Sequence, residues 1–153
     1  MDPHESNLWK FMQDNGISGE VLHFEESCHS VAEAAAAAKV DPDLFVKNIC
    51  MIGSVGLIVT IVKGEDRVST TNVGEVLGIE RPRTATPDEI LFLTGYPCGG
   101  TRSFGYKAVF LIDERVMERE IVYSGGGSTQ GLVRIASAEL VRANGGKVCR
   151  VRK

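Results

Sequence analysis

The fold is decided by residues 46–62, which read VKNICMIGSVGLIVTIV. This stretch contains two apolar runs, residues 46–52 and 57–62, separated by Gly53-Ser54-Val55-Gly56. Short apolar runs joined by a glycine-containing connection are typical of a β-hairpin. We therefore predict an antiparallel hairpin at the centre of the fold, with the rest of the chain arranged around it.

Helix and strand signals alternate irregularly on both sides of this hairpin. The clearest helix start is Thr86-Pro87-Asp88-Glu89, which combines an N-cap, a proline at the first helical position and a capping-box glutamate. Because strands come in hairpin-like groups, the pattern favours an α+β fold with a mixed sheet over a doubly wound parallel sheet. The other expected helices are residues 5–15, 31–38 after Ser30, 73–77 and a helix capped by Ser137, and the other expected strands are 21–25, 108–113, 121–123, 132–135 and 148–151.

Composition is that of one ordinary globular domain. The chain has 153 residues, of which 43% are hydrophobic and 24% charged, so we expect a single domain spanning residues 1–153. The longest uncharged apolar stretches contain glycine and fall short of the ~20 residues that a membrane helix needs. The N-terminus lacks the basic region and apolar run of a secretory signal, so a cytoplasmic location and no membrane partner are expected.

Charge is distributed unevenly along the chain. The formal net charge is −3, but residues 1–44 carry −7 while residues 45–153 carry +4. Such a segregation favours a basic face for a phosphate-bearing partner, although chance segregation of solvated charges is the plain alternative. An isoelectric point near 5.6 argues against binding to long duplex nucleic acid.

Metal, cofactor and triad chemistry have little support in the sequence. The four cysteines are scattered, without a C-x-x-C pair or a histidine at zinc-ligand spacing, so reduced thiols and no metal are expected. Residues 125–131 match neither the P-loop nor the dinucleotide motif, so no cofactor is predicted. Ser103 and Ser124 do not lie in a G-x-S-x-G elbow, and all three histidines fall in the first fifth of the chain, which disfavours a catalytic triad.

One lysine and two glycine-rich turns remain as candidates. Lys47 has apolar neighbours on both sides, which suggests an ammonium that reaches an anion at the sheet surface, or else a structural lysine with a buried stem. Residues 99–105 can direct several backbone N–H groups at one anion, or form only a flexible turn. Residues 124–127 leave a strand edge, where small side chains allow a ligand to approach the main chain.

The order and spacing of these features resemble the YbaK/prolyl-tRNA-synthetase-associated editing domain family over about residues 30–151. The motifs that carry the resemblance are Lys47, the hairpin end Lys63-Gly64, the pattern Gly95-Tyr96-x-x-Gly99-Gly100-x-x-Ser103-Phe104-Gly105, and Tyr123-Ser124-x-Gly126. The resemblance implies a single α+β domain whose curled, mostly antiparallel mixed sheet is barrel-like and flanked by helices. Two positions depart from the family's usual pattern: Asn48 stands where a small hydroxyl residue is common, and the turn Arg102-Ser103-Phe104-Gly105 lacks the usual proline.

The same resemblance implies a trans-acting deacylase that hydrolyses the ester of mischarged tRNA, of the Cys-tRNA(Pro) or Ala-tRNA(Pro) type. The alternatives are a non-catalytic module that binds tRNA ends or a synthetase, and a small nucleotide-binding protein. The implied partners are the aminoacyl-tRNA acceptor end and an aminoacyl-tRNA synthetase, and the basic residues Arg81, Arg83, Arg102 and Lys107 are expected to contact phosphates. The implied catalytic residues are Lys47, Gly100 and Ser124, and the implied substrate-binding residues are Gly99, Thr101, Arg102, Ser103, Phe104, Gly105 and Gly126.

Overall fold

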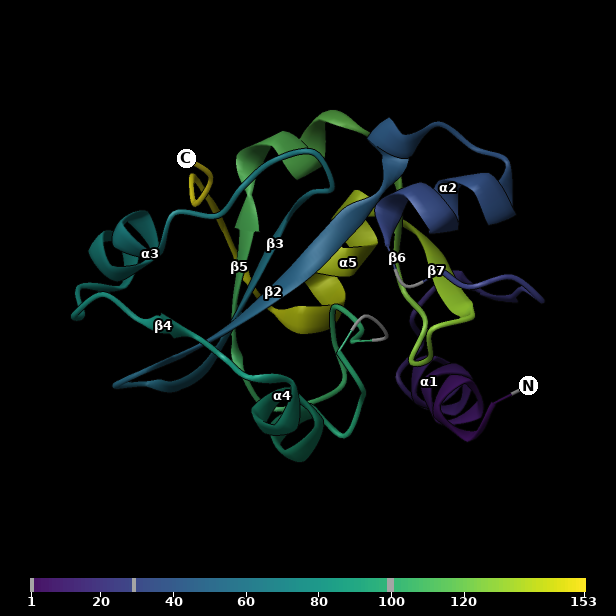
Figure 1. Cartoon of the computed structure of the whole chain (residues 1–153), viewed down its shortest axis with the longest axis horizontal. Helices are drawn as coiled ribbons and strands as arrows, with labels where there is room; N and C mark the ends of the chain where they lie inside the picture. The colour runs from purple at the N-terminus through teal and green to yellow at the C-terminus, as the bar shows by residue number, and fades with distance from the viewer. Residues whose placement is uncertain (1, 29, 99–100) are drawn as a thin grey trace.

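The structure, a computed structural model, describes residues 2–28, 30–98 and 101–153 (Figure 1). The predicted hairpin is present: β2 (Val46–Gly53) pairs antiparallel with β3 (Gly56–Lys63) along its whole length. Nearly all of β3 is buried, as its continuous apolar sequence requires. The hairpin therefore forms the centre of the larger of two sheets.

That larger sheet has five strands in the order β4-β2-β3-β5-β8. Its edge strands are β4 (Arg83–Thr84) and β8 (Lys147–Cys149), and β5 (Val109–Asp113) lies between β3 and β8. β5 pairs parallel with both β3 and β8, whereas β2 pairs antiparallel with β3 and β4. The sheet is thus mixed, as the irregular order of helices and strands predicted.

The smaller sheet is antiparallel and has the order β1-β7-β6, with β1 (Glu20–His23), β6 (Ile121–Gly125) and β7 (Gly131–Ala136). An isolated bridge between Phe45 and Tyr123 links it to the larger sheet. The expected barrel-like closure is not found among the described residues, which form two open sheets instead. Just before this bridge the chain forms a 3-10 turn in which the N–H groups of Leu44 and Phe45 donate to the carbonyls of Asp41 and Pro42, so they are not available for strand pairing.

Three of the five described helices begin at a residue other than the expected one, and one of these is α3, which Ser69 caps and which begins three residues before the expected start at 73. Thr86 caps α4 through the predicted capping box with Glu89. α1 begins earlier than expected because Asp2 caps it in a second capping box. Ser137, expected to be an N-cap, is instead the first residue of α5, and Ala136 holds the cap position without a side-chain bond. The helices are α1 (Pro3–Asp14), α2 (Val31–Ala38), α3 (Thr70–Leu77), α4 (Pro87–Thr94) and α5 (Ser137–Asn144), with 3-10 turns η1 (Pro42–Leu44) and η2 (Glu114–Glu118).

The largest apolar core contains residues from both sheets together with the inner face of α1. Leu8 and Met12 of α1 are buried in it with Phe104, which is fully enclosed. A separate cluster contains Met51, Ile58 and Val73. None of the described helices is both long enough and apolar enough to cross a membrane.

Candidate active site

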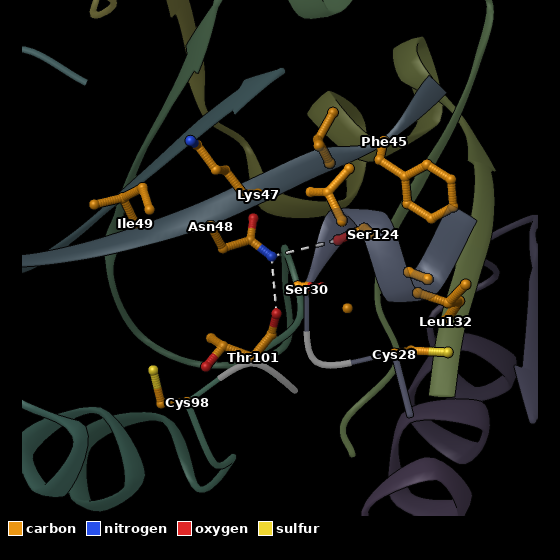
Figure 2. Close-up of a pocket in the computed structure, with 14 residues that line it drawn as sticks. Cys28, Ser30, Phe45, Lys47, Asn48, Ile49, Cys98, Thr101, Ser124 and Leu132 are labelled. Atoms are coloured by element: carbon orange, nitrogen blue, oxygen red, sulfur yellow. Dashed lines mark hydrogen bonds between the residues drawn. The ribbon is translucent and has the colours of Figure 1, made fainter. Parts of the chain in front are cut away.

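A pocket of about 240 Å³ lies beside the first half of β2 (Figure 2). Here β2 is paired with β3 on one side only, because among the described residues β4 reaches no further than Met51 and the bridge to β6 lies at Phe45. Residues 46–49 of β2 therefore present one edge to the pocket. Side chains from both faces of the strand can reach it from this edge.

Lys47 lines this pocket from β2 and is half-buried. In the part of the chain that the structure describes, its ammonium forms no ion pair and no hydrogen bond. Lys63, on the neighbouring strand, is the contrasting case, because its Nζ lies 2.5 Å from Asp43. Lys47 is thus a cation at the pocket with its charge available to a ligand.

Asn48 connects three segments beneath the pocket. Its Nδ2 donates to the carbonyl of Thr101 at 2.8 Å and to Ser124 Oγ at 3.4 Å, as Figure 2 shows. Ser103 Oγ donates to Asn48 Oδ1 at 2.8 Å and lies 2.5 Å from Ser124 Oγ. Because Ser103 has only one hydroxyl proton, which goes to Asn48, Ser124 is the donor of that last bond. Asn48, Ser124 and Ser103 form a closed ring of three hydrogen bonds, called the polar ring below.

The polar ring defines what Ser124 can do. Ser124 is 2% exposed and lines the pocket, while Ser103 is fully buried and supports it from behind. The proton of Ser124 is engaged within the ring, and no described histidine forms a hydrogen bond with its hydroxyl. Ser124 is therefore not an activated nucleophile of the Ser-His type. Its remaining lone pair can accept one hydrogen bond from the pocket.

Asn48 was named in the sequence only as a departure from a pattern, not as a site residue. A signal for it did exist, because it is a polar side chain next to Lys47 in a strand that is otherwise apolar. Its partners Thr101 and Ser124 are 53 and 76 residues away along the chain, so the pairing itself could not be read from the sequence.

The 101–106 loop places only one of its predicted substrate-binding side chains at the pocket. Thr101 lines the pocket, and its hydroxyl donates to the carbonyl of Pro97 at 3.2 Å. Phe104 is fully buried in the core and stacks on Phe11, with ring centroids 6.1 Å apart. Ser103 reaches the site only through the polar ring.

Arg102 does not face solvent, although a contact with tRNA phosphates would require an exposed guanidinium. It is 4% exposed, and its guanidinium lies 4.0 Å from the centroid of the Tyr96 ring. Its Nη2 donates to the carbonyl of Gly105 at 3.2 Å, and a Cβ on Gly105 would lie only 2.6 Å from that nitrogen. Burial lowers the pKa of this guanidinium. The other three residues expected to contact phosphates, Arg81, Arg83 and Lys107, are exposed. Arg83 forms a bidentate ion pair with Glu89.

The predicted glycines other than Gly105 fall into two groups. Gly99 and Gly100 lie outside the described residues. Gly126 is buried against β7, where a Cβ would lie 2.4 Å from the main chain of Gly131 and Leu132. This close approach requires glycine, but it is an approach to the protein's own strand rather than to the pocket.

The pocket is also lined by apolar side chains, both small and large, among them Phe45. Val31 and Ala34 of α2 line it together with Cys28 and Leu132. Burial, with Glu26 adding to it, raises the pKa of the Cys28 thiol, which disfavours the thiolate that nucleophilic attack would need. The described residues contain no group of three or more His, Cys, Asp or Glu side chains that could hold a metal ion.

Comparison with known proteins gives one family and several similar folds. The sequence model of a family described as "Aminoacyl-tRNA editing domain" matches residues 25–143. No curated protein sequence matches the chain. A crystal structure described as "a putative trans-editing enzyme for prolyl tRNA synthetase" has a TM-score of 0.93 at 24% identity, covering 100% of this chain and 99% of the other. A crystal structure of a hypothetical protein has a TM-score of 0.87 at 28% identity, covering 95% of this chain and 99% of the other.

Proposed function

Because the chain belongs to the aminoacyl-tRNA editing domain family, whose activity is aminoacyl-tRNA deacylation, we propose that it acts in trans on mischarged tRNA(Pro). The ester cleaved would join alanine or cysteine to the terminal ribose. The observation that carries the proposal is the pocket itself, which is lined by Lys47, whose ammonium has no partner among the described residues, and by Asn48 and Ser124 of the polar ring. The similar fold of the protein described as "a putative trans-editing enzyme for prolyl tRNA synthetase" supports the choice of tRNA.

The chemistry matches a site without a triad. An aminoacyl ester is already activated, so its hydrolysis needs positioning, a water molecule and charge stabilisation more than a strong nucleophile. In this proposal Lys47 pairs with the phosphate of the terminal nucleotide or orients the ester. Ser124 accepts a hydrogen bond from the attacking water through its free lone pair.

Amino acid selection would follow from the apolar part of the pocket. Phe45 and Leu132 bound this part of a pocket of about 240 Å³, so the space favours the methyl group of alanine or the sulfanylmethyl group of cysteine over a larger side chain. Exclusion by size is the second sieve of editing enzymes. We therefore expect Ala-tRNA(Pro) and Cys-tRNA(Pro) to be cleaved much faster than correctly charged Pro-tRNA(Pro).

The test is a deacylation panel with tRNA(Pro) charged with alanine, cysteine, serine or proline, and with correctly charged tRNA(Ala) and tRNA(Cys). Lys47→Ala is compared with Lys10→Ala, because Lys10 is exposed on α1 and lies outside the pocket. The expected result is rapid release of alanine or cysteine from tRNA(Pro), lost in Lys47→Ala and retained in Lys10→Ala. Release no faster than the spontaneous rate on every substrate would contradict the proposal. Thermal stabilisation by free nucleotides in that case would favour the nucleotide-binding alternative.

A further inference from the structure

Helix α1 contacts the site although it lies outside the segment that the family's sequence model matches. Figure 1 shows α1 beside the connection between β6 and β7. A Cβ on Gly127 in that connection would lie 2.9 Å from the carbonyl oxygen of His4, and Gly127 has a φ of +94° that favours glycine. The first turn of α1 therefore packs directly on the 125–131 loop.

Glu5 strengthens this contact from inside the protein. Its carboxylate is fully buried, accepts from the backbone N–H of Asp2 at 3.1 Å, and lies 2.8 Å from Nδ1 of His23. A Cβ on Gly131 would lie 2.7 Å from Glu5 Oε1, so the first residue of β7 packs directly against the Glu5 carboxylate. A buried carboxylate persists only where its oxygens have partners. Glu5 therefore holds α1, β1 and the start of β7 in a single arrangement.

The same helix also contacts the 101–106 loop. The Phe11 ring stacks on Phe104, and the guanidinium of Arg102 lies 5.3 Å from the centroid of Phe11. The His4 ring meets the Tyr96 ring edge-on, with centroids 5.5 Å apart. Nε and Nη1 of Arg102 are buried without a hydrogen-bond partner among the described residues, so aromatic faces are a main support of this side chain. Phe11 therefore contacts both Arg102 and Phe104 of this loop.

We infer that α1 is a clamp that holds the 101–106 and 125–131 loops in register, with Glu5 and Phe11 as its positioning residues. This inference rests on the proposed function. Ser103 belongs to the first loop and Ser124 stands just before the second, and their hydroxyl oxygens are 2.5 Å apart in the polar ring. A movement of either loop breaks that ring, and a misplacement on the order of 1 Å can cost about 10²-fold in rate.

The rival explanation is that α1 contributes only stability. If α1 contributes only stability, a substitution elsewhere that destabilises the protein equally should lower turnover equally. If α1 positions the loops, such a substitution should leave turnover unchanged. Val73 is fully buried in a separate cluster with Met51 and Ile58, so Val73→Ala destabilises the protein without touching α1. Trp9, half exposed on α1, supplies a control on the same helix that avoids the clamp contacts.

The experiment compares Phe11→Ala, Phe11→Tyr and Glu5→Gln with Val73→Ala and Trp9→Ala. For each variant, kcat and KM on mischarged tRNA are measured well below its melting temperature, together with hydrogen exchange in the 101–106 and 125–131 loops. We expect Phe11→Ala to lower kcat about tenfold with KM within about twofold, because positioning affects the transition state more than binding. Glu5→Gln should act in the same direction, Phe11→Tyr should restore turnover, and both controls should keep wild-type kcat.

Faster exchange in the 101–106 loop of Phe11→Ala, absent in Val73→Ala, is the second expected result. Should Phe11→Ala fail to fold, Phe11→Leu takes its place, because it keeps apolar volume but has no ring to stack. The clamp is refuted by wild-type kcat and unchanged exchange in the Phe11 variant, or by an equal loss of kcat in Val73→Ala. If the wild-type protein cleaves no mischarged tRNA, the proposed function fails, and the exchange measurement alone still decides the clamp.

Discussion

The open edge of β2 and the 101–106 loop each carry a cation that the sequence marks as functional, yet the two are placed in opposite ways. Lys47 lines the pocket with its ammonium unpaired among the described residues. Arg102, which has the longer side chain and sits in a glycine-rich loop, is 4% exposed and stacked on Tyr96. The residue in a regular strand is the accessible one, and the residue in the loop is enclosed.

The difference teaches that the direction of a side chain can be predicted for a residue in a regular strand, but not for a residue in a glycine-rich loop. In a strand the pleat sets the direction of each side chain. Among the described residues no second strand pairs with residues 46–49, and Lys47 therefore lines a cavity. In the loop, direction depends on what the chain folds back onto. Gly105, with a φ of +94°, lets the guanidinium lie against the main chain.

The largest effect should come from Lys47→Ala. We expect kcat/KM for mischarged tRNA to fall about 100-fold, equivalent to about 2.7 kcal/mol of transition-state stabilisation. The free energy of unfolding should change by less than about 0.5 kcal/mol, because the half-buried side chain has no partner to lose among the described residues. Kinetics and thermal melting check this. Full activity in a folded Lys47→Ala protein would show that Lys47 has no role in deacylation, and that its exposure to the pocket does not distinguish it functionally from Arg102.

Arg102→Ala should show the reverse pattern, a loss of stability rather than of tRNA binding. We expect a decrease of about 2–3 kcal/mol in the free energy of unfolding, because stacked contacts and the packed stem are lost together. Urea unfolding measures it. KM should keep the salt dependence of the wild type, since a buried guanidinium releases no counterions from tRNA. A flatter salt dependence with normal stability would show instead that Arg102 contacts a phosphate.

Asn48→Ala tests whether the two regions work as one site. Removing the amide opens the polar ring and leaves the buried Ser103 hydroxyl without its acceptor, so we expect a loss of about 1–2 kcal/mol in stability. Turnover should fall about tenfold, because Ser124 loses the donor that orients it. Deacylation and melting measurements on the same preparation check both. Ser69→Ala is the control, since it removes the N-cap hydrogen bond to Asn72 on α3, at a comparable cost in stability, and neither residue lines the pocket.

The smallest effect concerns a third cation, Arg83, which is exposed and already paired. Its two hydrogen bonds to Glu89 lower the pKa of that carboxyl to about 2, with the backbone N–H of Thr86 adding to the effect. A carboxyl whose pKa is lowered by folding contributes stability above its ordinary pKa, and that contribution is lost as the pH falls towards 2. The difference in melting temperature between wild type and Glu89→Gln should therefore be full at pH 7 and vanish near pH 2. Deacylation at pH 7 should be equal in both, because Glu89 is not among the residues that line the pocket.

Local signals predicted the elements well. The hairpin, the capping box at Thr86 and the end of α4 at Gly95 each depend on residues within one or two turns of each other, and each is confirmed. Ser137 shows the limit of such signals, because a serine one position inside a helix looks the same in sequence as a serine at the cap. The split into two sheets depends on Phe45 and Tyr123, which are far apart in the chain and pair at a single bridge.

The sequence by itself determined the α+β class, the central hairpin and the candidacy of Lys47, because periodicity, capping and an isolated charge in an apolar strand are properties of neighbouring residues. Only the tertiary structure decided that Arg102 turns inward, that Asn48 joins Ser103 and Ser124, and that α1 touches both site loops. Asn48 and Ser103 are 55 residues apart, and Phe11 is further still from Phe104. Contacts of this kind depend on the packing of the whole core, which no local pattern in the chain encodes.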